Sequence, residues 1–463
     1  MLTDKANSPS RWLPLLLALA IFMQMLDTTI LNTALPKIAA DLNESPLNMQ
    51  STIIAYALTI ALLVPLSGHL VDRFGTRNVF IVALSFFMLG SLMCAAAPNL
   101  PMLVFARVVQ GLGGSMLTLV PRLTLLRVYD KSQLLNALNY ALMPALIGPI
   151  LGPLVGGYLV EYASWHWIFL LNLPIGAIGI LAALKIMPNV KGEKSQFDII
   201  GFLLFAAAVC SLNLSVEIIL RPSAKLFSFL LAGSGLTALW FYRRHARNTK
   251  EPLYAGNLFK VRTYRVGLTG NLVSRLGISS VPFLLPLLFQ VAFGFTASFS
   301  GWLISTIALA AFITKPLTKP VMMRFGYRNV LIMNTRLLGA LIMLLALPSA
   351  HTSFSVWMVL LFIMGISNSL QFSAMNTLTI ADLRPYQTGS GNSLMAVNQQ
   401  LSMSFGIALG ALVLQSTTKT SFAVDNLHIA FRYTFVVIGA ITFASSWIFL
   451  RLHTRDGHNL VAK

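Results

Sequence analysis

The sequence predicts an all-α polytopic membrane protein made of two six-helix bundles and an inserted two-helix hairpin. Of its 463 residues, 56% are hydrophobic and 10% are charged, whereas soluble proteins carry about 25% charged residues. About fourteen runs of some 20 apolar residues are long enough to cross a bilayer. The segment RFGTRNV at Arg73–Val79 returns as RFGYRNV at Arg324–Val330, 251 positions later, which indicates two homologous halves.

The apolar runs, taken in order, define the predicted elements. Polar, glycine-containing or proline-containing segments separate neighbouring runs. The first six form residues 1–188, and the last six, shifted by the same 251 positions, form residues 263–463. Runs seven and eight lie between two basic loops and form an inserted hairpin within residues 189–262. The runs lie at 13–35, 49–69, 79–97, 102–126, 134–160, 167–188, 199–219, 226–242, 263–292, 300–320, 329–349, 355–380, 389–415 and 431–450.

The net charge of +19 reflects membrane topology rather than nucleic-acid binding. With both termini in the cytoplasm, most Lys and Arg residues lie in inner loops or at inner helix ends, as the positive-inside rule requires. Both cysteines lie inside apolar runs, and the seven histidines lack metal-ligand spacing. We therefore expect a multi-pass inner-membrane protein with no cofactor, no metal and no nucleic-acid partner, and no catalytic constellation of an enzyme.

The first apolar run contains the most unusual residue, Asp27, which lies deep in the predicted membrane. Ionisable groups are costly there and mark functional sites. Gln24 and Thr28 extend the polar stripe, and Arg107 with Gln110 forms a polar face on the fourth helix at a similar depth. We expect Asp27 and Arg107 to form a proton-coupling pair, with a purely structural ion pair as the alternative. Glycines beside Gln110 predict a close approach of the first and fourth helices.

The repeated loop is a candidate gate between the second and third helices. Asp72 could lie against the positive end of a neighbouring helix, which the glycine-rich segment before the thirteenth helix would supply. This contact would hold the inner side shut and break on inward opening, whereas a basic loop that only sets topology is the alternative. In the second copy Met323 replaces the aspartate. The candidate gating residues are Gly68, Asp72, Arg73, Gly75 and Arg77, with Arg324, Gly326 and Arg328 in the second copy.

The fifth helix carries a series of small residues and prolines. Glycines at i, i+4 and i+8 form a seam that packs against another helix. Prolines can bend such a helix where neighbours satisfy the freed carbonyls. The residues are Gly148, Pro149, Gly152, Gly156 and Gly157.

The second half is polar without being acidic. Its deep Arg275 needs a partner, water or an anion, whereas each amide alone could serve only to hold helices together. Lys315 and Arg336 are expected to extend to the inner surface. The candidate cavity residues from both halves are Gln24, Thr28, Gln110, Asn271, Arg275, Asn368, Gln371, Asn398 and Gln399.

Several motifs together resemble the major facilitator superfamily, in its branch of fourteen-helix drug:proton antiporters. These are LDTTILNTALP, GHLVDRFGTRN, LVFARVVQGLGGS, the fifth-helix glycines and WHWIFLLNLPIG, in that order. Within the branch, the sequence is similar to MdtD-type multidrug resistance proteins. The resemblance implies that Arg107 takes part in proton coupling and that the fifth-helix element belongs to an antiporter.

The sequence thus favours a proton-coupled exporter of small organic molecules, drugs in the first place, that works as a monomer by alternating access. An exporter of a metabolite anion, such as a carboxylate or its metal chelate, is the main alternative, because deep arginines face a single aspartate. Uptake by symport, a channel and a membrane sensor that transports nothing are the others.

Overall fold

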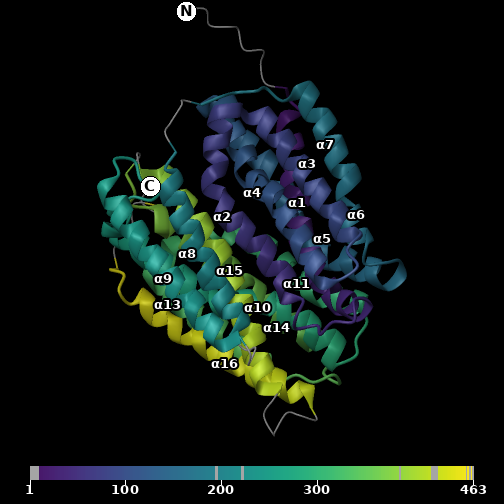
Figure 1. Ribbon diagram of the computed structural model, residues 1–463. Helices are drawn as coiled ribbons and strands as arrows, with labels where there is room; N and C mark the ends of the chain where they lie inside the picture. Colours follow the sequence, from purple (N-terminus) through teal and green to yellow (C-terminus); the bar gives the residue numbers. More distant parts are fainter. Residues whose placement is uncertain are drawn as a thin grey trace, which may run out of the picture.

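The computed structural model describes residues 10–192, 197–219, 224–384, 387–418, 426–454, 456–457 and 460. Its helices run roughly side by side, with the amino-terminal half and the carboxyl-terminal half forming two bundles (Figure 1). We call the end of the molecule at which the first helix begins the inner end, and the opposite end the outer end. In Figure 1 the inner end of the amino-terminal bundle is at the top.

The amino-terminal bundle contains six spans, of which the sixth is interrupted at Leu171. Pro14 lies in the first turn of the first helix, where its missing N–H costs nothing, and Asn99 caps the fourth by accepting a bond from the Met102 N–H. The elements are α1 (Leu13–Asp41), α2 (Gln50–Phe74), α3 (Thr76–Ala95), α4 (Leu100–Val128), α5 (Lys131–Tyr162), α6 (Trp167–Leu170) and α7 (Asn172–Ile186).

The inserted hairpin consists of α8 (Ile199–Ile218) and α9 (Lys225–Asn248), followed by the short helix η2 (Gly256–Lys260). Asp198 closes its inner end: its carboxylate accepts the Gly201 N–H at 2.9 Å, the Leu253 N–H at 3.1 Å and His245 Nε2 at 2.7 Å. This carboxylate therefore joins the start of α8, the end of α9 and the loop that leads to the second bundle.

The carboxyl-terminal bundle repeats the arrangement of the first. Its first span ends in a π-turn after Pro286, and its second is interrupted by a short turn at Pro316. The elements are α10 (Arg262–Leu287), η3 (Leu288–Ala292), α11 (Ala297–Thr314), η4 (Lys315–Leu317), α12 (Thr318–Phe325), α13 (Tyr327–Leu344), α14 (Phe354–Ile380), α15 (Thr388–Thr418) and α16 (Leu427–Phe449).

Thirteen helical segments in the described part of the chain are long and apolar enough to cross a membrane. The remaining sequence run corresponds to α13, whose 18 residues would measure about 27 Å and include Arg328 and Arg336. The fold class predicted from the sequence is confirmed: this is an all-helical, multi-pass membrane protein.

The two bundles meet tightly at the outer end. Gln290 Nε2 donates to the Thr33 carbonyl at 2.9 Å, and the Ser298 N–H donates to Glu161 Oε2 at 2.9 Å. A continuous apolar core surrounds these bonds and includes Ile30, Phe289 and Trp357. The outer end is therefore closed.

At the inner end a cavity of about 810 Å³ separates the bundles. Gly68 and Leu119 lie on its amino-terminal side, and Gly389 and Gln399 lie on its carboxyl-terminal side. We refer to it as the inner cavity. The structure is thus open at its inner end and shut at its outer end.

Candidate functional site

Asp27 lies at the centre of a hydrogen-bonded cluster buried in the amino-terminal bundle. Its side chain is 1% exposed, and Arg107 Nη1 approaches its Oδ2 at 2.7 Å. Its Oδ1 accepts N–H groups from Gln110 Nε2 at 2.8 Å and Asn172 Nδ2 at 3.1 Å. Ser91 Oγ accepts from the same two amides at 2.8 and 3.1 Å. We call these five residues the Asp27 cluster; the ion pair expected between Asp27 and Arg107 is present.

Arg107 is held by more than its aspartate. Its Nη1 also donates to Gln110 Oε1 at 2.5 Å, and its Nε donates to the Thr52 carbonyl at 3.4 Å. Its guanidinium carbon lies 4.1 Å from the centre of the Tyr56 ring, within the range of a cation–π contact. The guanidinium therefore keeps partners on α2 and α4 even without the carboxylate.

Close helix packing positions this cluster. A Cβ on Gly111 would lie 2.7 Å from the Thr59 Cβ of α2, and one on Gly114 would lie 2.7 Å from the Tyr56 hydroxyl of α2. A Cβ on the neighbouring Gly113 would lie 2.3 Å from the Ala83 carbonyl of α3. The expectation that these glycines bring α4 against α1 is therefore wrong. They bring α4 against α2 and α3, and α1 reaches α4 through Gln24, whose Nε2 donates to the Gly114 carbonyl at 3.0 Å.

Asn172 was missed by the sequence analysis. It is the first residue of α7 and is 1% exposed. A single amide inside the apolar segment FLLNLPIG was the available signal. An apolar run alone does not say which face of a helix meets the bundle interior, so the role of this amide became visible only in three dimensions.

A second cavity of about 390 Å³ lies between the two bundles, and we call it the central cavity. Thr28, Asn32 and Pro149 line it from the amino-terminal half. Thr28 follows Asp27 directly, so the cavity adjoins the Asp27 cluster along α1. Apolar side chains, including Ile53 and Phe283, complete the walls.

The central cavity is basic. Arg275 of α10 lines it with its guanidinium carbon 4.7 Å from the centre of the Phe372 ring, and Lys315 and Asn368 line it too. None of the described residues on its wall is acidic. Lys315 was expected to extend to the inner surface; its side chain is exposed and lines this cavity, at the turn Lys315–Leu317 that interrupts the span.

The other predicted cavity residues divide into three groups. Gln399 lines the inner cavity and donates to Asn376 Oδ1 at 2.8 Å. Gln24, Gln110, Gln371 and Asn398 bond to other helices of their own bundles, and none of them lines the central cavity.

Gln371 illustrates the second group. Its Nε2 donates to Thr335 Oγ1 at 2.7 Å, and its Oε1 accepts from Asn334 Nδ2 at 3.0 Å, so it joins α13 to α14. Asn271 differs: it is fully buried, and within the described structure its side chain has no hydrogen-bond partner.

The first copy of the repeated loop packs on the segment that follows α7. Gly75, at φ +91°, links α2 to α3, and the Thr76 N–H donates to the Val190 carbonyl at 3.0 Å. Asn189 Oδ1 accepts the Arg77 N–H at 3.1 Å and so caps α3. The loop is therefore tied to its own bundle.

Asp72 pairs with Arg127 at the inner end of α4. Its expected partner was the start of α15. Gly389 and Asn392 of α15 line the carboxyl-terminal side of the inner cavity, whereas Gly68, near Asp72 on α2, lines the amino-terminal side. In this inward-open form the carboxylate therefore contacts its own bundle.

The second copy of the loop has a similar setting. Gly326, at φ +74°, links α12 to α13. Arg73 and Arg324 stack on the following phenylalanines at 5.4 and 5.6 Å. Arg262 Nη2 lies 2.5 Å from Oδ1 of Asp456, a residue that follows the last helix. The repeat therefore preserves backbone shape where it has lost the aspartate. Arg328 lies at the start of α13.

The fifth-helix glycines face two neighbours. A Cβ on Gly148 would lie 2.9 Å from the Met25 Cβ of α1, one on Gly152 2.0 Å from Thr29 Oγ1, and one on Gly156 2.7 Å from the Ile30 carbonyl. A Cβ on Gly157 would instead lie 2.4 Å from the Ala297 carbonyl of α11, in the other bundle. The motif therefore packs α5 against both α1 and α11.

Comparison with known proteins gives a consistent result. The family model described as Major Facilitator Superfamily matches residues 17–246 and 267–463. A probable transport protein, HsrA, from Haemophilus influenzae is 41% identical over 462 residues, covering 99% of both chains. A putative multidrug resistance protein, MdtD, from Klebsiella pneumoniae is 41% identical over 458 residues, covering 98% of this chain and 97% of its own.

Solved structures agree on the fold. A peptide transporter, crystallised with sulfate, superposes with a TM-score of 0.73 at 14% identity, covering 98% of each chain. A D-xylose-proton symporter superposes with a TM-score of 0.68 at 13% identity, covering 94% of this chain and 96% of its own.

Proposed function

The chain belongs to the major facilitator superfamily of membrane transporters, and from this premise we propose that it is a proton-coupled exporter of small amphiphilic organic anions. Drug-like acids and metabolite carboxylates fall within this class. The exporter works in the bacterial inner membrane as a monomer, with both termini in the cytoplasm. The inner end of the structure then faces the cytoplasm, from which the cargo enters.

The observation that carries the choice of cargo is the charge of the central cavity. Arg275 and Lys315 line it, and its described wall holds no acidic residue. A cation without an acidic partner in the membrane-spanning part of the protein favours an anionic ligand and disfavours a cationic one. Apolar walls from Ile53 to Phe283 suit an aromatic or aliphatic body.

The hydrogen bonds of Asp27 support its role as the proton carrier. Both of its oxygens accept bonds from nitrogen donors, an arrangement that suits an ionised carboxylate, which has no proton to donate. The inward-open form thus fits a carrier that has released its proton and awaits cargo. Outward opening of the bundles would expose the cluster to protons, and neutralising Asp27 would loosen its bonds to α4 and α7.

The names of the relatives give a second candidate. Multidrug resistance proteins share about 40% identity with this chain over nearly its full length, which supports export of lipophilic drugs. The two candidates differ in cargo charge and share the transport cycle. A cationic drug would have to bind beside Arg275 and Lys315.

The test compares cargo charges in inside-out vesicles that carry the protein, energised by an imposed pH gradient. Matched panels of radiolabelled organic anions and cations are offered, and uptake into the vesicles reports export. For Arg275→Gln and Lys315→Gln we expect anion affinity to fall by about 10-fold or more each, the scale of a lost charge-assisted hydrogen bond.

Two surface variants are the controls. Arg265→Gln, exposed on α10, and Lys319→Gln, exposed on α12, remove the same charge away from the central cavity, and both should retain full affinity. If the protein transports cations in preference to anions, and if the Arg275→Gln variant binds the transported compounds as tightly as the parent does, the drug proposal replaces the anion proposal. Absence of flux for both panels would favour a sensor.

A further inference from the structure

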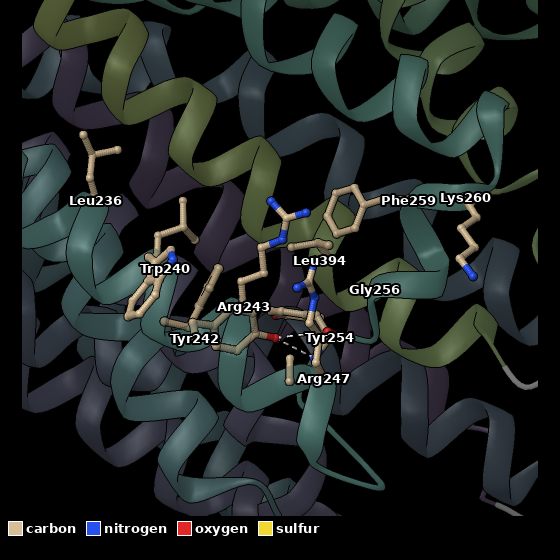
Figure 2. Close-up of a pocket in the computed structure, with 13 residues that line it drawn as sticks. Leu236, Trp240, Tyr242, Arg243, Arg247, Tyr254, Gly256, Phe259, Lys260 and Leu394 are labelled. Carbon is tan, nitrogen blue, oxygen red and sulfur yellow. Dashed lines mark hydrogen bonds between the residues drawn. The ribbon is translucent and has the colours of Figure 1, made fainter.

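A pocket of about 930 Å³ lies outside the transport path, between the inserted hairpin and the carboxyl-terminal bundle (Figure 2). One wall is the inner half of α9, and the opposite wall is η2, with Phe259 and Lys260. Buried side chains form its floor: Phe205, Tyr242, Tyr254 and Leu394. Tyr242 and Tyr254 are joined by two hydrogen bonds, so this floor is fixed.

The pocket carries positive charge without a matching carboxylate. Arg243, Arg247 and Lys260 line it, and all three are exposed. Figure 2 shows both arginines reaching from α9 into the space beside Phe259 and Leu394. No acidic residue lies among the described residues of its wall, and none of these three cations joins an ion pair in the described structure.

The wall on α9 is amphipathic along its length. Leu236, Leu239, Trp240, Arg243 and Arg247 share one helical face, since they follow at i, i+3, i+4, i+7 and i+11. The apolar members lie near the middle of α9 and the arginines lie at its inner end, so the face changes from apolar to cationic over about 11 residues, or about 16 Å.

The hairpin also lacks protein cover on this side. Only 17% of the α9 span lies buried in protein, the lowest share of the thirteen spans in the described chain. Leu236 and Trp240 are 60% and 56% exposed. A ligand with an anionic head and apolar chains would match both ends of this surface.

We propose that this pocket binds one anionic phospholipid of the cytoplasmic leaflet. Its phosphate lies between Arg243, Arg247 and Lys260, and its acyl chains run along Leu236 and Trp240. Basic pockets between helices at the cytoplasmic side are typical sites for anionic headgroups. The assignment rests on the topology given under the proposed function, and it is independent of the cargo.

The position of the pocket gives such a lipid a structural consequence. Leu394 belongs to α15, and the hydroxyl of the neighbouring Ser393 lies 3.3 Å from that of Tyr254 in the linker. Ser404 of α15 donates to Asn213 of α8 at 2.6 Å. The lipid therefore fills the space where the hairpin and α15 meet, and it holds the hairpin to the carboxyl-terminal bundle.

The experiment measures lipid retention on the purified full-length protein by native mass spectrometry. Dioleoyl-phosphatidylglycerol is titrated against dioleoyl-phosphatidylcholine, and glycerol phosphate is added as a soluble anion with the same head chemistry. We expect one phosphatidylglycerol to stay bound under conditions that remove phosphatidylcholine. In the Arg243→Gln/Arg247→Gln variant its affinity should fall by about 30-fold, the effect of two interfacial charges.

A charge-matched control is Lys250→Gln/Arg265→Gln, since both residues are exposed and neither lines the pocket. It should retain the lipid. A second test fills the pocket without changing charge: a Cβ on Gly256 would meet nothing within 4 Å, so Gly256→Leu should fold normally and still weaken retention.

Three results would overturn the proposal. If the arginine double variant and its control retain phosphatidylglycerol equally, the retained molecule is ordinary lipid that surrounds the protein. Displacement of the lipid by glycerol phosphate would mean a site for a soluble anion, and equal binding of phosphatidylcholine would remove the role of the headgroup. Because no transport is measured, failure here leaves the proposed cargo and coupling untouched.

Discussion

Replacing Asp27 by asparagine separates proton coupling from folding. The carboxylate and Arg107 are each 1% exposed, and removing one partner of such a buried pair costs about 3–5 kcal/mol. Arg107 keeps the Gln110 oxygen, the Thr52 carbonyl and the Tyr56 ring, so its guanidinium is not left without partners, and the asparagine oxygen can still accept a hydrogen bond. We therefore expect Asp27→Asn to lose stability at the lower end of this range, about 3 kcal/mol, and still fold.

Thermal unfolding in detergent measures that loss. The double variant Asp27→Asn/Arg107→Gln should unfold at a higher temperature than Asp27→Asn alone, because no buried charge is left unpaired. In proteoliposomes with an imposed pH gradient, Asp27→Asn should no longer accumulate cargo against its concentration gradient, although downhill exchange can continue. Asp41→Asn, which removes an exposed carboxylate at the outer end of α1, should transport normally. Uphill accumulation by Asp27→Asn, driven by the pH gradient alone, would refute the assignment.

Asn172→Ala removes one of the N–H donors to Asp27, so we expect about a 10-fold loss of proton-driven transport, seen as a shifted pH profile in a folded protein. Gly152→Val should sharply reduce stability, because its Cβ would lie 2.0 Å from Thr29 Oγ1, whereas Gly389→Ala, with nothing within 4 Å, should be neutral in the same unfolding assay. Burial alone would raise the pKa of Asp198, but the N–H groups of Gly201 and Leu253 and the contact with His245 outweigh it and hold this pKa below its usual value. Stabilisation by Asp198 is therefore present above the unfolded-state pKa of about 3.9 and is lost as the pH falls further, so Asp198→Asn should differ from the parent at neutral pH and converge with it in acid.

The sequence predicted the architecture well because its signals are local. An apolar run of membrane length leaves few alternatives to a spanning helix, and the repeated loop predicted two homologous halves. The pair of Asp27 and Arg107 was also predictable, since depth along a helix follows from residue count alone. Those arguments use only position along the helix axis.

The sequence did not show how each helix is rotated about its own axis, and therefore which neighbours its side chains face. Gln371 was expected in the cavity, yet it faces α13, because apolar spans buried on several sides show little amphipathic pattern. The sequence also did not indicate that Lys315 lines the central cavity, at the turn Lys315–Leu317. Asp72 meets Arg127, a residue 55 positions away, and no periodicity identifies such a partner.

The contact between α5 and α11 also has a mechanical consequence. Gly157 lies against the backbone of Ala297, and Gly301 lies against the backbone of Pro153, so two main chains touch near the outer end with no side chain between them. Such a contact can act as a fulcrum. From Gly157 to the inner end of α5 at Lys131 is 26 residues, or about 39 Å of helix. A 10° rotation at that point would displace the inner end by about 7 Å, enough to narrow the inner cavity while the glycines scarcely separate. Larger residues at these two glycines would therefore move the pivot and change which side of the membrane the protein faces at rest.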